Sequence, residues 1–416
     1  MTSRPGSHGL ARTAKPTGVV AKERVGVPFL LLLVWIWFEY GRPANPLGIP
    51  LLISVALLVG WLIKKDYRWS PQSSLLIAFL VVMAAGIPLA ANTFSAFWSL
   101  YGMATIFVCI CLPIPSLVTS VRRVRVWIYT FVGVAFYVGL WAIFHGGYGP
   151  SGAAGGQDEN YVAAMMGMAV SFAYFSIFAA RRPIVKVILA LSILVFLGAI
   201  VAGNDVSRGG FLGMCAVFLY CMLRSPRKWI GFVVLAVIIA VVMPFVPSSY
   251  WDDIVTIGDV HEGTADLRLE IWQIGIRMWR ANPVFGVGAG NFRWNVGKYQ
   301  SSEQREKYDR DLGGSVIAHS LFVEVLAELG TLGALVLLLL LWRTWKDLRR
   351  VVRLGSGDGR LPLRCYADAV TGAILACLVN GAFLSLLYYS YLWLFIALGT
   401  AIGQLSRSHV ELEQTA

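Results

Sequence analysis

The chain has 416 residues, of which 57% are hydrophobic and only 14% are charged, and its mean hydropathy is +0.67. These values exclude an ordinary soluble domain and a disordered chain, and they indicate a membrane protein with many spans. The formal net charge of +12 would suit a nucleic-acid-binding protein, but the positions of the basic residues give it another meaning.

Twelve stretches have the apolar character of membrane spans, each of which needs about 20 predominantly apolar residues. They are residues 25–40, 47–63, 75–91, 97–118, 124–144, 160–180, 185–203, 209–223, 229–246, 317–342, 367–385 and 388–405. The first and the eighth are short for a span. We therefore predict an all-α, polytopic membrane protein with about twelve transmembrane helices and one long periplasmic segment that contains amphipathic helices.

The predicted organisation has five parts. A basic tail (1–24) precedes spans 1–9 (25–246), the long segment (247–316) follows, and spans 10–12 (317–405) lead to a short tail (406–416). If the N-terminus lies inside, 25 of the 35 lysines and arginines fall in inner segments. Cytoplasmic loops carry such an excess. The net charge is therefore a topology signal, not a nucleic-acid footprint, and it places both termini in the cytoplasm.

No pattern in the sequence predicts a metal, a cofactor or a disulfide framework. Five of the six cysteines lie in predicted spans, and Cys365 lies on the predicted cytoplasmic side, so none suits an extracellular disulfide. The acidic groups around Asp252 and His261 have no recognised ligand spacing. The turn from Gly286 to Phe292 is either plain turn chemistry or an anion-binding nest.

The long segment contains one strongly patterned helix, from Asp266 to Ala281, which Pro283 stops. At about 100° per residue, its polar side chains fall on one narrow arc. They are Glu270, Gln273, Arg277 and Arg280.

Arg268 does not join that arc and projects from the apolar face, beside Trp272, Gly275 and Trp279. A buried guanidinium needs a partner. Two interpretations remain open. Either Arg268 frays toward water or pairs with Asp266, or it faces an anionic ligand near a helix N-terminus, where anions are favoured.

Polar groups also open two other spans on the predicted outer side. Asp158, Glu159 and Asn160 begin span 6, where they either cap the helix or contact an acceptor hydroxyl. Arg208 begins span 8, where it either pairs with Asp205 at the interface or captures a phosphate, for which the guanidinium fork is suited.

His319 stands at the predicted outer start of span 10. On a helix it would share a face with Phe322 and Leu326, with Glu324 and Glu328 on roughly the opposite face. A histidine there is either a satisfied structural residue or a catalytic one. The glutamates are expected to pair with arginines or polar neighbours, although ionisable groups within spans are functional candidates.

Several stretches together resemble the superfamily of O-antigen ligases and O-antigen polymerases, which are bacterial envelope glycosyltransferases. They are Ser207-Arg208-Gly209-Gly210, Leu267-Arg268-Leu269 with Trp272, Asn282-Pro283-Val284-Phe285-Gly286-Val287-Gly288, and His319-Ser320 followed by Glu324, Glu328, Leu329, Gly330, Thr331, Leu332 and Gly333. The resemblance is concentrated in residues 155–345. Each motif is weak alone, and their order makes the set specific.

The resemblance implies a bacterial inner-membrane enzyme whose active site faces the periplasm and that uses no metal. It implies a glycan donor on undecaprenyl diphosphate and an acceptor that is either lipid A-core, for a ligase, or another lipid-linked glycan, for a polymerase. It also implies that Arg208, Arg268 and His319 are the functional trio. Arg277, Arg280 and Arg293 are further candidates for binding donor or acceptor, together with Asp158 and Asn160.

These residues suit an inverting transfer. Guanidinium groups stabilise the charge that develops on a departing diphosphate, and an imidazole accepts the proton of the attacking hydroxyl. A protein O-oligosaccharyltransferase, a non-catalytic assembly scaffold and a polysaccharide or lipid transporter are the alternatives. Against the transporter, the chain shows no internal repeat with matching broken helices.

Overall fold

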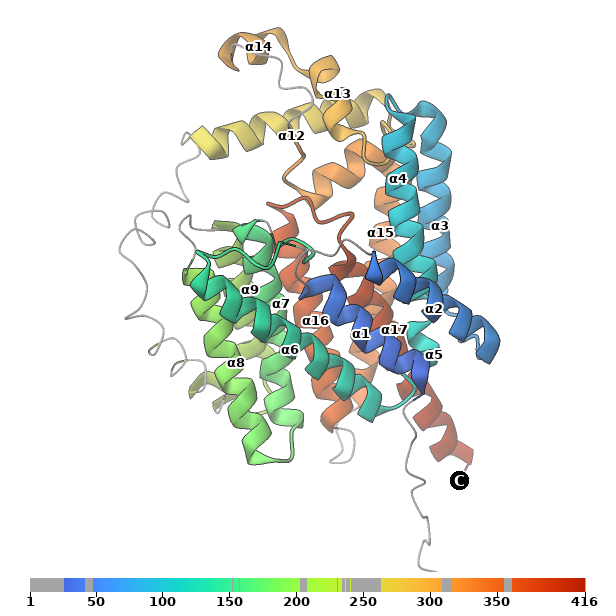
Figure 1. Cartoon of the computed structure of the whole chain (residues 1–416), viewed down its shortest axis with the longest axis vertical. Helices are drawn as coiled ribbons and strands as arrows, with labels where there is room; N and C mark the ends of the chain where they lie inside the picture. Colours follow the sequence, from blue (N-terminus) through green and yellow to red (C-terminus); the bar gives the residue numbers. More distant parts are fainter. Residues whose placement is uncertain are drawn as a thin grey trace, which may run out of the picture.

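The computed structural model describes residues 26–41, 48–202 apart from 152 and 157, 208–233 apart from 230, 236, 240, 263–308, 316–354 and 361–415. All regular structure among these residues is helical, which confirms the all-α prediction for this part of the chain. In Figure 1 most helices run along one axis and form a bundle, and one helix, α12, lies across an end of it.

Seven helices within the described ranges are long and apolar enough to cross a membrane. They are Pro71–Leu89 (α3, Pro71–Gly86, with η1, Ile87–Leu89), Thr93–Leu117 (α4, Thr93–Ala104, with η2, Thr105–Cys111, and α5, Ile114–Leu117), Val121–Phe144 (α6), Glu159–Ala179 (α7), Pro183–Val201 (α8), Leu321–Leu354 (α15) and Leu361–Gly381 (α16). The chain is thus a multi-pass membrane protein.

Four more helices cover predicted spans. Val27–Tyr40 (α1), Ile49–Lys64 (α2) and Arg208–Arg224 (α9) are apolar but shorter, and Ser390–Thr415 (α17) covers the last predicted span. The ninth predicted span, residues 229–246, falls largely outside the described residues. The count of twelve spans therefore stays a prediction, as does the five-part division of the chain.

Local sequence explains where several helices begin. Ser70 forms a capping box with Ser73 just before Pro71, the first residue of α3. Asn92 and Ser120 accept hydrogen bonds from backbone N–H groups in the first turns of α4 and α6. Such side chains satisfy N–H groups that have no partner within the helix.

One end of the bundle carries the predicted inner ends of the helices. Gln72 at the start of α3 donates to Asp347 in the last turns of α15, and Arg224 at the end of α9 pairs with Asp368, about two turns into α16. Arg125 donates to Tyr366 at the same end. Helix ends that the lysine and arginine count predicts on one side are thus in contact, and we call this the basic end.

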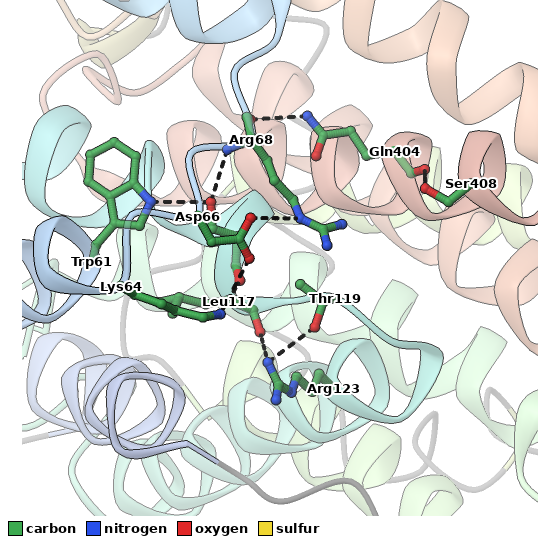
Figure 2. Close-up of polar contacts among 10 residues, drawn as sticks. Trp61, Lys64, Asp66, Arg68, Leu117, Thr119, Arg123, Gln404 and Ser408 are labelled. Carbon is green, nitrogen blue, oxygen red and sulfur yellow. Dashed lines mark hydrogen bonds and ion pairs between the residues drawn. The ribbon is translucent and has the colours of Figure 1, made fainter. Parts of the chain in front are cut away.

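Figure 2 shows a polar network at the basic end. Trp61 Nε1 and the backbone N–H of Arg68 both donate to Ser116 Oγ at 3.2 Å. Gln404 of α17 donates to the Arg68 carbonyl, also at 3.2 Å, and Asp66 pairs with Lys64 and Arg68. These contacts tie the connection after α2 to α5 and α17.

The other end carries the predicted outer ends. The backbone N–H of Asn92, just before α4, donates to Asn291, and Ser390 at the start of α17 donates to Glu39 at the end of α1. The helix α12 (Gly263–Ala281) lies across this end, with α13 (Phe292–Tyr299) and α14 (Ser302–Tyr308) beyond it (Figure 1). We call it the α12 end.

The helix α7 lies at the centre of the bundle. It is buried along almost its whole length and packs against α16, α8 and α9. Its first residues emerge at the α12 end, which places Asp158 and Asn160 beside the segments that carry the other candidate residues.

Candidate active site at the α12 end

The helix α12 is seated on α15 by a stripe of apolar residues. Ile271, Ile274 and Met278 are buried in a cluster with Phe292 and Val296 of α13. Gly275 makes the crossing close, because a Cβ built there would lie 2.4 Å from Val323 Cγ1 on α15. The helix ends at Ala281, as Asn282-Pro283 predicts, and begins at Gly263, three residues before the predicted start.

The connection between α12 and α13 is inserted into a break in α15. Gly330 has φ 64° and ψ −164° inside that helix. Past the break, the N–H groups of Thr331 and Leu332 donate to the carbonyls of Pro283 and Val284 instead of to their own helix. Before the break, the carbonyls of Ala327 and Glu328 accept from the N–H groups of Val287 and Gly288. Backbone groups freed by the break are therefore satisfied by the connection.

The glycine-rich turn does form an anion nest, and the anion is a carboxylate of the same chain. Gly286, Gly288 and Gly290 all have positive φ. The N–H groups of Gly290 and Phe292 donate to the Glu328 carboxylate at 2.6 and 2.7 Å, and the Tyr388 hydroxyl donates to it as well. The expectation that Glu328 pairs with polar neighbours is thus confirmed. The Glu328 carboxylate occupies the nest.

His319 does not lie on a helix, which corrects the predicted helical start of span 10. The helix α15 begins at Leu321, and Ser320 caps it by accepting from the N–H of Val323 at 3.5 Å. His319 precedes the cap with φ 45°, a backbone conformation uncommon for any residue except glycine. The predicted shared face with Phe322 and Leu326 is therefore wrong, and the left-handed turn decides where the imidazole lies.

Charges on two other segments act on the half-buried His319 ring. Burial lowers the pKa of His319 below its usual 6.5, the Arg268 guanidinium lowers it further, and the Asp158 carboxylate acts in the opposite direction. Three residues singled out from the sequence, on three separate segments, thus come together at the α12 end. Arg268 itself is half-buried at the edge of the apolar stripe of α12.

Asp158 and Asn160 begin α7 beside this group. The backbone N–H of Asn160 donates to Asp158 Oδ1 at 2.8 Å, and the Asn160 side chain donates to Glu159 at 3.2 Å. The capping interpretation is thus confirmed. The second interpretation, contact with an acceptor hydroxyl, stays a prediction. It is compatible with the cap, because the cap uses one carboxylate oxygen and the Asp158 charge still acts on His319.

The connection between α16 and α17, residues 382–389, closes the site from the other side. Its Leu387 N–H donates to Glu324 at 3.3 Å, and its Ser385 carbonyl accepts from Tyr161 at 3.2 Å. Tyr389 packs on Tyr161 with ring centroids 4.7 Å apart. Burial, and the charges of Asp158 and Glu324, raise the pKa of Tyr389, so its hydroxyl stays protonated and can take part in hydrogen bonds.

Arg208 is the first residue of α9, and its side chain lies outside the described residues. The adjacent Gly209 allows α9 to approach connection 382–389, since a Cβ built there would lie 3.1 Å from Phe383 Cβ. The start of α9 therefore borders the same connection that carries Tyr389.

The other three arginine candidates differ from Arg268 in their surroundings. Arg277 donates to the Tyr299 carbonyl at 2.7 Å and to Gln304, so it braces α12 against α13 and α14. Arg280 and Arg293 are exposed at the α12 end. Their role in binding stays a prediction.

Sequence reasoning missed two donors. Tyr389 carried no signal, because it stands in an apolar stretch taken as a span. Trp272 did carry a signal, because it lies one helical turn from Arg268. Its Nε1 is buried, with no hydrogen-bond partner among the described residues. Asp252 and His261, weighed for a metal, lie outside the described residues.

The arrangement can perform acid–base and anion chemistry together. A neutral imidazole beside a fixed cation can accept a proton near neutral pH while the cation attracts a negatively charged group. The other groups that surround it, a capping carboxylate and a tyrosine hydroxyl, suit the hydrogen bonding of a hydroxyl-rich ligand.

Comparison with known proteins gives one family. Residues 193–338 match the family model described as O-antigen ligase. No curated protein matches the chain. A solved structure described as "Structural coordination of polymerization and crosslinking by a peptidoglycan synthase complex" is similar at 16% identity and a TM-score of 0.43, over 83% of this chain and 98% of that one.

Proposed function

We propose that the protein transfers a glycan from undecaprenyl diphosphate to an acceptor hydroxyl of lipid A-core. The match of residues 193–338 to the O-antigen ligase family model supports this proposal. The matched range includes Arg208, Arg268 and His319. The transfer takes place at the periplasmic face of the bacterial inner membrane, needs no metal and inverts the anomeric carbon. The family-model match supports the class of transferase, and the site supports the roles below.

One observation carries the proposal: Arg268 acts on a His319 whose pKa is lowered. A histidine with a lowered pKa is neutral at neutral pH and is ready to act as a base. The nearby guanidinium is suited to the diphosphate of the donor, because charge-assisted hydrogen bonds to phosphate oxygens are strong.

The proposed reaction is a single displacement. The acceptor oxygen forms a bond to the anomeric carbon as His319 takes the hydroxyl proton. The bond between that carbon and the diphosphate oxygen breaks, and its electron pair leaves with the lipid diphosphate. Arg268 and Arg208 stabilise the resulting negative charge. Attack opposite to the leaving group inverts the anomeric configuration.

The remaining candidates would hold sugar hydroxyls and further phosphate oxygens. The Asp158 charge acts on His319, and Asp158 and Asn160 would contact the acceptor. Arg280 and Arg293 present exposed guanidinium groups at the same end. Arg277 acts on binding through its brace to α13 and α14. A polymerase would use the same groups with a second lipid-linked glycan as acceptor.

The test is transfer by purified protein with undecaprenyl-diphosphate glycan, offered either lipid A-core or a second lipid-linked glycan. We expect product on lipid A-core, a loss of about 10²- to 10⁴-fold in His319→Ala, and a loss of about 10²- to 10³-fold in Arg268→Ala. Arg208→Ala is expected to lower the rate in the same way.

Two variants serve as matched controls. His145→Ala changes an exposed histidine at the α12 end that stacks on Trp141, and Arg305→Ala changes an exposed arginine on α14. Both should keep the parent rate. Chain extension on the lipid-linked acceptor would make the protein a polymerase with the same site. If no glycan is transferred, or the site variants match the controls, the transfer mechanism is wrong and transport becomes the leading hypothesis.

A further inference from the structure

A cavity of about 650 Å³ opens at the basic end of the bundle, far from the α12 end. Most of its wall is the last part of α15. The cations that line it are Arg343, Lys346, Arg349, Arg350, Arg353 and Arg407. None of these residues belongs to the site described above.

The charge in this cavity is strongly unbalanced. Among the described residues that line it, six side chains are cationic and one, that of Asp347, is a carboxylate. Asp347 accepts from Gln72 at 2.8 Å and pairs with Arg407, so it is engaged with α3 and α17. The five cations on α15 thus surround a space that attracts an anion of more than one charge or one held by several donors.

A second cavity, of about 570 Å³, lies on the neighbouring side of α15. Its wall comes from α9, α15 and α16 and is almost entirely apolar: it includes Leu338, Leu341, Leu348, Ile374 and Leu378. A free anion has no use for such a surface, whereas an acyl chain does.

Trp342 and Trp345 line both cavities and join them. Their side chains are 46% and 45% exposed. Arg343 and Arg349 lie over these rings at 5.0 and 4.9 Å from the centroids of Trp342 and Trp345. Tryptophan is enriched where a membrane meets water, so the pair marks the boundary between the apolar and the basic half.

We propose that the two cavities together form a binding site for an anionic phospholipid, with the phosphate headgroup in the basic cavity and an acyl chain in the apolar one. Charge complementarity selects the headgroup, and the tryptophan pair sets the depth at which it lies. The positions of the lysines and arginines predict that this is the cytoplasmic leaflet. The site is separate from the proposed transferase site and does not depend on it.

The test uses the full-length protein in neutral detergent with three probes. These are phosphatidylglycerol, phosphatidylcholine with the same acyl chains, and inorganic phosphate. Native mass spectrometry counts retained lipid, and thermal unfolding reports stabilisation. We expect phosphatidylglycerol to be retained and to raise Tm, and the other two to have little effect. Equal retention of the two lipids, or an equal Tm rise with phosphate alone, would overturn the proposal.

Variants separate the cavity from general surface charge. Arg343→Gln/Lys346→Gln/Arg350→Gln should weaken phosphatidylglycerol binding by at least about tenfold. Arg181→Gln/Arg182→Gln/Lys186→Gln removes the same charge from exposed positions just before α8 and in its first turn and should bind as the parent does. Equal losses in both triples would contradict a built site. Should the first triple not fold, Trp345→Ala, which removes the shared wall, is expected to lower retention instead.

Discussion

Opposing charges act on the imidazole of His319. Burial and Arg268 lower its pKa, Asp158 raises it, and the net effect is a lowering. The three residues come from the connection before α15, from α12 and from the cap of α7. The protonation state of the proposed base is therefore set by how these segments meet, and changing one charge should shift it in a defined direction.

We predict that transfer activity falls at low pH with a midpoint below 6.5, because the base works only when neutral and its pKa is lowered. Asp158→Asn removes a charge that favours the protonated ring, so the midpoint should move to lower pH. Arg268→Gln removes a charge that disfavours it, so the residual activity should show a midpoint at higher pH. The measurement is kcat/KM against pH for each variant.

Asp158→Asn is a clean substitution, since asparagine caps helices about as well as aspartate and α7 should keep its start. Shifts of the two midpoints in the same direction would contradict the electrostatic account. An unchanged midpoint in both variants would show that another group governs the acid side of the profile.

At the scale of elements, the break in α15 organises the α12 end. The connection after α12 takes over the hydrogen bonds that the break releases at Thr331 and Leu332, and Glu328 one turn earlier holds the glycine nest. The helix that carries Arg268 is in this way locked to the helix that His319 precedes. The break is therefore part of how the site is positioned.

Gly330→Ala should weaken the contact between the break in α15 and the connection after α12. Its φ and ψ fall in a region open essentially only to glycine, where another residue costs about 1–3 kcal/mol, and a Cβ would lie 2.4 Å from the Val284 carbonyl oxygen. We expect a lower Tm in detergent and faster proteolysis of residues 263–308.

Gly102→Ala on α4 is the control for that substitution, because nothing lies within 4 Å of the added methyl group and alanine favours a helix by about 1 kcal/mol. It should leave Tm unchanged or raise it. If Gly330→Ala and Gly102→Ala have the same effect on Tm and on proteolysis, the break in α15 tolerates a side chain and does not hold residues 263–308 in place.

At the scale of the whole molecule, the two ends of the bundle differ in composition. Six cations among the described residues line one cavity at the basic end, whereas the cap of α7, the glycine nest and His319 lie at the α12 end. Hydrogen bonds join helix ends predicted to share a side, as between Arg224 and Asp368 or between Asn92 and Asn291. The side of the membrane that each end faces stays a prediction.

We predict that a membrane-impermeant maleimide labels Lys298→Cys, but not Lys65→Cys, in intact spheroplasts that express a protein otherwise free of cysteine. Both positions are exposed, one on α13 and the other just after α2, so reactivity reports the side of the membrane. Both should react once the membrane is permeabilised. Labelling of Lys65→Cys before permeabilisation would reverse the orientation and move the transferase site to the cytoplasm.

Sequence reasoning went furthest where the signal is local. Apolar length marks a span and a proline after Asn282 stops a helix, so most predicted spans and the end of α12 agree with the structure to within a few residues. It failed at His319, because the helical face was extended back to a residue two positions before the helix begins at Leu321. A single residue in the left-handed backbone conformation before a helix cap produces no periodic pattern in the sequence.

The sequence by itself determined that this is an all-helical membrane protein, and it singled out Arg268, Asp158 and His319, because period, charge and span ends are properties of neighbouring residues. Only the tertiary structure decided that the nest binds Glu328, 38 residues along the chain from Gly290, and that Tyr389 joins the site. Those pairings depend on a helix that breaks to admit another segment. No local pattern encodes them, because the partner groups meet only when the bundle closes.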